Sequence, residues 1–175
     1  MNRPDNIAII ATVAKNGVIG KQGVPPWHIQ EDIEHFLKKT EHASIVVGRR
    51  TFEALSREHR SKISHRRIII MSRHEDYKVH GKLTAHNWPA VVDYARTTEQ
   101  NVFVIGGQSL FKLALPVASN VYLTRVDQDA EGDAQFPPWN PEGWKRVEND
   151  DCKCKQDCGV KFSFETWQRG NAAQV

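Results

Sequence analysis

Residues 44–55, SIVVGRRTFEAL, pass from a short apolar run to a segment that suits a helix. The run Ile45–Val47 is β-branched and continuous, which is typical of a strand buried on both faces of a parallel sheet. Gly48 ends this run, and the polar residues after it can open a helix. The stretch therefore predicts one strand–helix unit of an α/β fold.

The same alternation runs through most of the chain. Apolar runs predict further strands, and helix-like segments lie between them: strands at residues 7–13, 67–71, 102–106 and 121–126, helices at residues 31–40, 51–58, 89–99 and 108–115, and loops at residues 74–82 and 129–143. Residues 160–167 alternate between apolar and polar side chains, so with residues 143–149 they predict an antiparallel hairpin at the sheet edge. We expect one domain over residues 1–168 and a frayed tail over residues 169–175.

The composition supports one core and excludes a membrane-spanning class. The chain has 175 residues, of which 39% are hydrophobic, and no apolar run approaches the roughly 20 residues that cross a bilayer. The start, MNRPDN, lacks the apolar segment of a secretory signal. We therefore expect a cytoplasmic protein with no membrane partner.

Positive charge is concentrated between Arg57 and Arg73, although the net charge is only +3. Arginine, lysine and histidine recur in this segment, and Glu58 alone opposes them. Such a surface suits a polyanionic small molecule, a nucleic acid or simply solvent. The charge pattern alone does not choose among these.

Cys152, Cys154 and Cys158 are the only cysteines. Their odd number and their crowding argue against the disulfide framework of a secreted protein. No Cys-x-x-Cys pair or nearby histidine supplies a fourth ligand for a metal. We expect ordinary thiols in a reducing cytosol and no metal site.

Two strand–helix junctions have the composition of an anion site. Gly48 is followed by two arginines, whose guanidinium groups form charge-assisted hydrogen bonds with phosphate. Gly106 and Gly107 would let a phosphate or a ring approach the backbone closely. The chain has no Gly-x-Gly-x-x-Gly fingerprint. Two such junctions at the carboxyl edge of one sheet nevertheless suggest an extended phosphate-bearing ligand.

The position of Asp32 in the sequence is compatible with two roles, one in helix stability and one in a functional pocket. It lies five residues after Trp27 and one helical turn before Phe36, so its carboxylate would sit beside an aromatic ring. An acid in a first helical turn commonly complements the helix dipole. A carboxylate partly removed from water must instead find donors or shift its pKa upward, as in a functional pocket. The pattern alone leaves both alternatives open.

Together these motifs resemble the chromosomal-type, bacterial-like dihydrofolate reductases from about residue 7 to residue 167. The matching segments are, in chain order, ATVAKNGVIG, PWHIQEDIEHF, IVVGRRTFEAL, RRIIIMSR, VFVIGGQSLF, VYLTRV and EGDAQFP. The resemblance implies a single α/β domain with an eight-stranded, mostly parallel twisted sheet and about four flanking helices. It also implies a monomer that uses NADPH to reduce 7,8-dihydrofolate to tetrahydrofolate and that binds antifolate inhibitors.

The resemblance implies a catalytic set of Asp32, Trp27 and Thr124. Asp32 would be the only ionisable group in the pterin pocket and would accept hydrogen bonds from the pterin N3 and 2-amino groups. Thr124 would hydrogen-bond Asp32, and the indole of Trp27 would hold a water nearby. Arg66 would pair with the α-carboxylate of the glutamate tail. The other implied substrate contacts are Ile10, Ala11, Ile33, Phe36, Leu55, Ile63 and Ile105.

The resemblance also implies a cofactor site along the strand ends. A cis peptide bond would join Gly106 and Gly107, and Ser72 and Arg73 would lie near the 2′-phosphate, which favours NADPH over NADH. Residues 17–26 would close over the nicotinamide, supported by residues 131–136. The remaining implied cofactor contacts are Ala11, Thr12, Ile19, Gly20, Gly48, Arg49, Arg50, Thr51, Met71, Ile105, Gln108, Ser109, Leu110 and Phe111.

The implied reaction moves a hydride from nicotinamide C4 to pterin C6, while water brings a proton to N5. A related pyrimidine or pteridine reductase of the same fold is the alternative enzyme, but it would not require Trp27, Asp32 and Thr124 together. A non-catalytic nucleic-acid-binding protein, the alternative of another class, would need binding elements outside the fold that the sequence lacks. The chain departs from the family pattern in its longer segment between Leu55 and Arg66 and at Pro25, Phe52 and Phe111.

Overall fold

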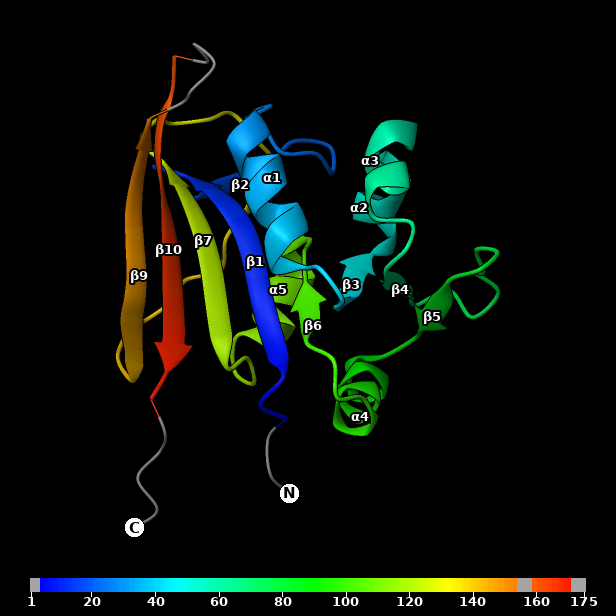
Figure 1. The fold of residues 1–175 in the computed structure, drawn as a ribbon. Coiled ribbons are helices and arrows are strands. Elements are labelled where there is room, and N and C mark those ends of the chain that lie inside the picture. Colours follow the sequence, from blue (N-terminus) through cyan, green and yellow to red (C-terminus); the bar gives the residue numbers. More distant parts are fainter. Residues whose placement is uncertain (1–3, 154–158, 171–175) are drawn as a thin grey trace.

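One eight-stranded sheet, in the order β5-β4-β3-β6-β1-β7-β10-β9, organises the chain (Figure 1). The computed structural model describes residues 4–153 and 159–170. The sheet strands are β1 (Ile7–Ala14), β3 (Ser44–Gly48), β4 (Arg67–Met71), β5 (Leu83–Ala85), β6 (Val102–Val104), β7 (Asn120–Val126), β9 (Trp144–Lys153) and β10 (Lys161–Arg169). Pairs from β5 to β7 are parallel, and both pairs that involve β10 are antiparallel. The predicted parallel sheet with a C-terminal hairpin is confirmed.

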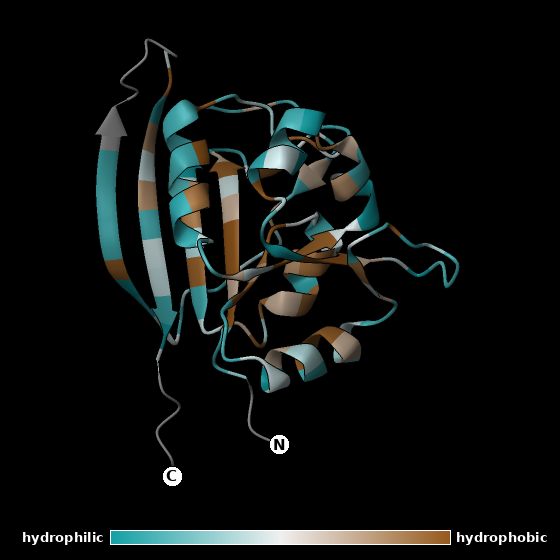
Figure 2. Cartoon of the chain, turned by 45° about the vertical axis from the view of Figure 1, so that its right-hand side comes forward, coloured by the Kyte–Doolittle hydropathy of each residue, from teal (hydrophilic) through white to brown (hydrophobic). Residues whose placement is uncertain are grey.

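The parallel strands are buried on both faces, as their continuous apolar runs indicate. Ile45, Val46 and Val47 have no exposed surface. Because successive side chains on a strand point to opposite faces, Val46 packs in one apolar cluster while Ile45 and Val47 pack in another. Figure 2 shows these central strands as the most hydrophobic part of the molecule. The β-branched runs thus decide the position of the core.

Five helices flank the sheet in the described residues, rather than about four: α1 (Gln30–Lys39), α2 (Arg49–Ala54), α3 (Arg57–Lys62), α4 (Trp88–Thr97) and α5 (Gln108–Ala114). The predicted helix over residues 51–58 is broken, because Leu55 and Ser56 have extended backbones. The Ser56 hydroxyl accepts a hydrogen bond from the His59 backbone N–H and caps α3. In Figure 1, α1, α2 and α3 lie toward the carboxyl ends of the parallel strands, and α4 lies at the opposite end.

A small second sheet pairs β2 (Val18–Gly20) with β8 (Ala134–Gln135), which interrupts the loop predicted at residues 129–143. Just beyond β2, the Gln22 backbone N–H donates to both carboxylate oxygens of Asp133, at 3.0 and 3.2 Å. The contact expected between residues 17–26 and residues 131–136 is therefore present, and it holds the segment that precedes α1.

The C-terminal hairpin ends the sheet with a polar edge strand. Residues 145–151 of β9 are all exposed, and this strand is the hydrophilic ribbon at the left of Figure 2. Charged side chains on an edge strand oppose pairing with other chains. Arg169 ends β10, and the Gly170 N–H donates to the Gly143 carbonyl. The domain boundary expected at residue 168 stays a prediction.

Some predictions fall outside the described residues. Cys154, Cys158 and residues 171–175 lie there, so the expectations for the cysteines and for most of the tail stay predictions. In residues 4–153 and 159–170, no helix combines the length and apolar character needed to cross a bilayer. The same residues contain no group of three or more histidine, cysteine, aspartate or glutamate side chains that could hold a metal ion.

Helix α1 contacts the C-terminal hairpin through His35, whose ring stacks on Phe164 with centroids 4.0 Å apart. Burial of the imidazole lowers the pKa of His35 to about 4, and the nearby Lys39 ammonium lowers it further in the same direction. Glu148 and Asp150 on β9 oppose this shift. The ring is therefore neutral in the folded protein at neutral pH.

This neutral histidine predicts a loss of stability in mild acid. Between pH 6.5 and pH 4, the His35 imidazole is protonated in the unfolded chain but largely neutral in the folded protein. The free energy of unfolding therefore falls as pH falls through that window. Because the ring is partly exposed and solvent screens it, we expect a loss of about 1 kcal/mol between pH 7.5 and pH 5. Urea denaturation of wild type and His35→Phe at both pH values measures it.

The His35→Phe variant keeps an aromatic ring against Phe164 but cannot titrate, so its stability should depend less on pH. Exposed His80→Phe serves as the matched control and should keep the wild-type pH dependence. An unchanged slope in His35→Phe would show that another group carries the effect.

Candidate active site

A cavity opens where β1 and β6 separate. Their pairing ends at Ile9 and Val104, whereas β1 stays paired with β7 as far as Ala14 and Val126. Helix α1 and the segment before it cover the opening, which encloses about 460 Å³. The predicted site residues that line this cavity are Ile10, Ala11, Thr12, Ile19, Gly20, Trp27, Asp32, Ile33, Phe36, Thr51, Leu55, Ile63, Ile105, Gly106, Gly107 and Phe111.

Asp32 projects from the first turn of α1 toward two threonines on the sheet. The Thr124 hydroxyl donates to Asp32 Oδ1 at 2.6 Å, which is the hydrogen bond expected from the sequence. The Thr12 hydroxyl donates to Asp32 Oδ2 at 2.5 Å, a contact that was not expected. The carboxylate is thus held from both of its oxygens.

Burial raises the pKa of the Asp32 carboxyl, and the hydrogen bonds from Thr12 and Thr124 partly oppose this rise. Asp32 is only half-buried as a whole residue because it faces an open cavity. Of the described residues that line the cavity, Asp32 is the only acid. A single desolvated carboxylate in an apolar pocket can recognise a ligand that presents paired N–H donors.

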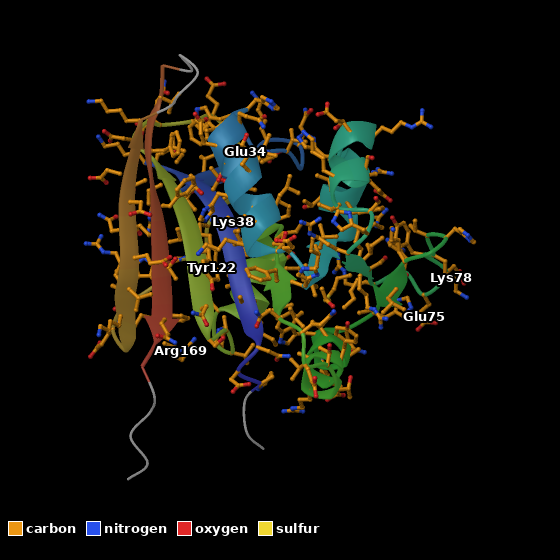
Figure 3. All side chains as sticks on the ribbon, in the orientation of Figure 1. Glu34, Lys38, Glu75, Lys78, Tyr122 and Arg169 are labelled. Carbon is orange, nitrogen blue, oxygen red and sulfur yellow. The ribbon has the colours of Figure 1, made fainter. Side chains whose placement is uncertain are left out.

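Part of the cavity wall comes from the expected closing segment and its support, namely Gly23, Val24, Pro25, Pro26 and Ala134. The wall also includes residues for which the sequence suggested no site role: His28, Ile29, Leu37, His59 and Lys62. Leu37 could have been assigned to the wall, because it shares the apolar side of α1 with Ile33 and Phe36. His59 and Lys62 could not, because they belong to α3, in the lengthened segment. Glu34 and Lys38 lie on the opposite, exposed side of α1 (Figure 3).

Arg66 lies outside the cavity lining, and its expected contact with the substrate tail stays a prediction. The residue is 7% exposed. Its Nε donates to the carbonyl and hydroxyl oxygens of Thr40 at 3.1 and 3.0 Å, Nη1 to the Lys62 carbonyl at 3.0 Å and Nη2 to the Leu37 carbonyl at 2.8 Å. Arg66 thus joins the end of α1 to the end of α3.

The two glycine-containing junctions meet beside the cavity. The Gly48 backbone N–H donates to the Gly106 carbonyl at 2.8 Å, and the peptide bond between Gly106 and Gly107 is cis, as expected. Gly106 has φ +121°, a conformation that L side chains rarely adopt. A Cβ on Gly107 would lie 3.2 Å from Thr51 Oγ1. Side chains at either position would therefore strain or crowd the backbone cradle.

The other expected cofactor residues lie outside the cavity lining: Gly48, Arg49, Arg50, Met71, Ser72, Arg73, Gln108, Ser109 and Leu110. Arg50 and Arg73 are exposed at the strand ends, where phosphates could reach them. Ser72 is buried, and its hydroxyl accepts from the His74 backbone N–H. The Leu110 side chain belongs to the core rather than to a ligand surface. Arg50 and Arg73 therefore place exposed positive charge at the strand ends, and the expected cofactor contacts of this group stay predictions.

Comparison with known proteins agrees with this arrangement. The sequence model of the dihydrofolate reductase family matches residues 6–169. The chain belongs to the dihydrofolate reductase family. It is therefore an NADPH-dependent oxidoreductase with dihydrofolate reductase activity, and the fold and family expected from the sequence are confirmed.

Individual relatives match over most of their length. The type 3 dihydrofolate reductase of Salmonella typhimurium is 35% identical over 142 residues, which cover 81% of this chain and 85% of that protein. The dihydrofolate reductase of Bacillus subtilis is 29% identical over 169 residues, covering 97% and 98%. The structure of the Enterococcus faecalis enzyme complexed with NADP(H) and RAB-propyl superposes with a TM-score of 0.83 and 29% identity, covering 97% of this chain and 99% of that one.

Proposed function

We propose that Asp32 recognises the pterin of 7,8-dihydrofolate and thereby directs its reduction to tetrahydrofolate. The observation that supports this role is a single half-buried carboxylate held by two hydroxyls in a mostly apolar cavity. An ionised carboxylate offers about four acceptor positions, of which the threonines use two. The remaining positions suit the planar donor pair formed by pterin N3 and the 2-amino group.

Bound NADPH would supply the hydride that reaches pterin C6. Gly106 and Gly107 would border it, and Arg49, Arg50 and Arg73 would contact its phosphates. Asp32 would polarise the pterin and favour protonation at N5, with the proton delivered by water that Trp27 helps to position. The apolar side chains of Ile33, Phe36 and Ile63 would exclude other water and align the two rings.

The anionic tail of the substrate would lie at the end of the cavity lined by α3. Lys62 is the only lysine or arginine among the described residues that line the cavity. Its ammonium is 2.7 Å from a carboxylate oxygen of exposed Glu58, and it retains further donors for a ligand. His28 and His59 flank this end, with ring centroids 6.4 Å apart. We assign the main tail contact to Lys62, with Arg66 fixing the backbone around it.

The same pocket would bind antifolate inhibitors, whose 4-amino groups would meet the backbone carbonyls of Ile10 and Ile105. We also propose that the protein is a monomer in the cytoplasm, with no nucleic acid or membrane partner. Binding and steering of anionic ligands give the basic segment between Arg57 and Arg73 a use without nucleic acid.

NADPH oxidation in the presence of dihydrofolate tests the proposed substrate. We expect saturable turnover with dihydrofolate and at most slow oxidation with the aminopyrimidine substrate of a riboflavin-pathway reductase, because that compound leaves the apolar wall unfilled. The measurement is the loss of NADPH absorbance, with tetrahydrofolate confirmed by chromatography. Tight NADPH binding without dihydrofolate turnover would contradict the proposal and favour a related reductase.

A further inference from the structure

The sequence suggested that Thr12 contacts the cofactor. In the structure, its hydroxyl instead donates a hydrogen bond to Asp32. Thr12 lies on β1 directly opposite Thr124 on β7. Paired residues on neighbouring parallel strands point to the same face of a sheet. Both hydroxyls therefore face α1, and each reaches a different oxygen of the Asp32 carboxylate.

This arrangement favours the ionised form of Asp32. An ionised carboxylate accepts a hydrogen bond at each oxygen, whereas a protonated carboxyl must donate from one of them. Two hydroxyl donors aimed at two different oxygens thus stabilise the charged form of Asp32 more than the neutral form. Burial acts in the opposite direction and raises the pKa of Asp32, and the Thr12 hydrogen bond is the larger of the two that lower it.

The arrangement also fixes the plane of the carboxylate. β-Branched threonine has few χ1 positions on a strand, so its hydroxyl is directionally constrained. With one donor at each oxygen, rotation of the carboxylate would break at least one short hydrogen bond. Each oxygen keeps one acceptor position for a ligand, so the threonine pair determines where a planar pair of N–H donors can bind.

Other charged groups near Asp32 lie farther along the same elements or across the cavity. Glu31 is its neighbour on α1, and Arg125 follows Thr124 on β7 but points to the opposite face, where it pairs with Glu165. His28, His59 and Lys62 are the titratable groups on the other cavity walls. None of these replaces a hydroxyl that directly contacts Asp32.

We propose that Thr12 is a positioning residue of the reductase, which favours the ionised form of Asp32 and holds its carboxylate plane for the pterin. The assignment rests on the proposed function of Asp32. It distinguishes Thr12 from a cofactor contact, because a positioning role acts on the acidity of Asp32 and on dihydrofolate, and a cofactor role acts on NADPH.

Two substitutions test the assignment. Thr12→Val keeps the β-branched shape and removes the hydroxyl, and Thr12→Ser restores a hydroxyl. In Thr12→Val we expect the apparent pKa that controls kcat/KM for dihydrofolate to move upward by about one pH unit. We expect Thr12→Ser to return it toward the wild-type value. The KM for NADPH should change by less than about twofold in both variants.

A second measurement does not depend on turnover. Carbon-13 NMR titration of the Asp32 carboxyl in the free protein, assigned by its loss in Asp32→Asn, reports the pKa directly. We expect the same upward movement in Thr12→Val and recovery in Thr12→Ser. If dihydrofolate is not turned over but the titration moves, the proposed function fails, whereas the effect of Thr12 on the Asp32 carboxylate stands. An unmoved titration, or a raised KM for NADPH alone, overturns the positioning role.

Discussion

Asp32→Asn lowers kcat/KM for dihydrofolate by about 10²–10⁴-fold at neutral pH, which is the range expected for loss of a positioned acid–base group. An asparagine keeps the size of the side chain but presents one acceptor and one NH₂ donor where the pterin needs two acceptors. The variant should therefore lose transition-state stabilisation, with KM for NADPH nearly unchanged. Steady-state kinetics with each substrate varied in turn measures both effects.

The dependence of this loss on pH follows from the role of Asp32. If the carboxylate acts by favouring protonation of the pterin at N5, substrate already protonated in acid should partly escape the defect. The ratio of wild-type to variant kcat/KM should therefore shrink as pH falls. Glu34→Gln is the matched control, because Glu34 is an acid on the exposed side of the same helix (Figure 3), and it should retain wild-type kinetics. Near-normal activity of Asp32→Asn would refute the role of Asp32.

The loss of activity in Asp32→Asn should not result from unfolding of the variant. Burial raises the pKa of Asp32, so from its ordinary value up to the raised one the folded state binds more protons than the unfolded state. The free energy of unfolding consequently falls as pH rises through that window. A neutral asparagine avoids this cost, and the threonine hydroxyls can accept from its NH₂ group. We expect the thermal midpoint of Asp32→Asn at pH 7.5 to equal or exceed that of wild type.

The fold could be predicted from the sequence because its evidence is local. The runs around Val46 and Ile69 are β-branched and uninterrupted, which indicates buried strands without reference to any other part of the chain. The break between α2 and α3 at Ser56 was not predicted, because the evidence for it is not visible in the local sequence. Residues 51–58 suit a helix by composition, and only the capping hydrogen bond to His59 shows that two helices meet there.

Parts of the site could not be predicted from the sequence, because they depend on contacts between residues that are far apart in the chain. The family resemblance implied a cofactor contact for Thr12, whereas its contact with Asp32 follows from the register of β1 with β7. Lys62 lies in the segment where the chain is longer than its family pattern, so no matched position suggested a role. Its aromatic neighbours, which are close in the sequence, made Asp32 a candidate, and the family resemblance implied its role.

Arg66→Leu should lower the free energy of unfolding by about 2–4 kcal/mol, because it removes a buried cation and leaves backbone carbonyls without donors. The carbonyls of Leu37, Thr40 and Lys62 all accept from Arg66. Leucine fills part of the space but donates nothing, so the ends of α1 and α3 should separate. Urea denaturation measures the loss, and KM for dihydrofolate should rise as a secondary effect because α3 carries Lys62.

Lys62→Gln separates binding from stability. Lys62 is partly exposed and pairs with an exposed glutamate, so its replacement should change the free energy of unfolding by less than about 0.5 kcal/mol. Loss of its charge should weaken binding of the anionic tail by about 1 kcal/mol, or about fivefold in KM for dihydrofolate, without affecting KM for NADPH. If Arg66→Leu instead kept wild-type stability and Lys62→Gln left KM unchanged, Arg66 would be the tail-binding residue and the guanidinium contacts with α1 and α3 would be incidental to folding.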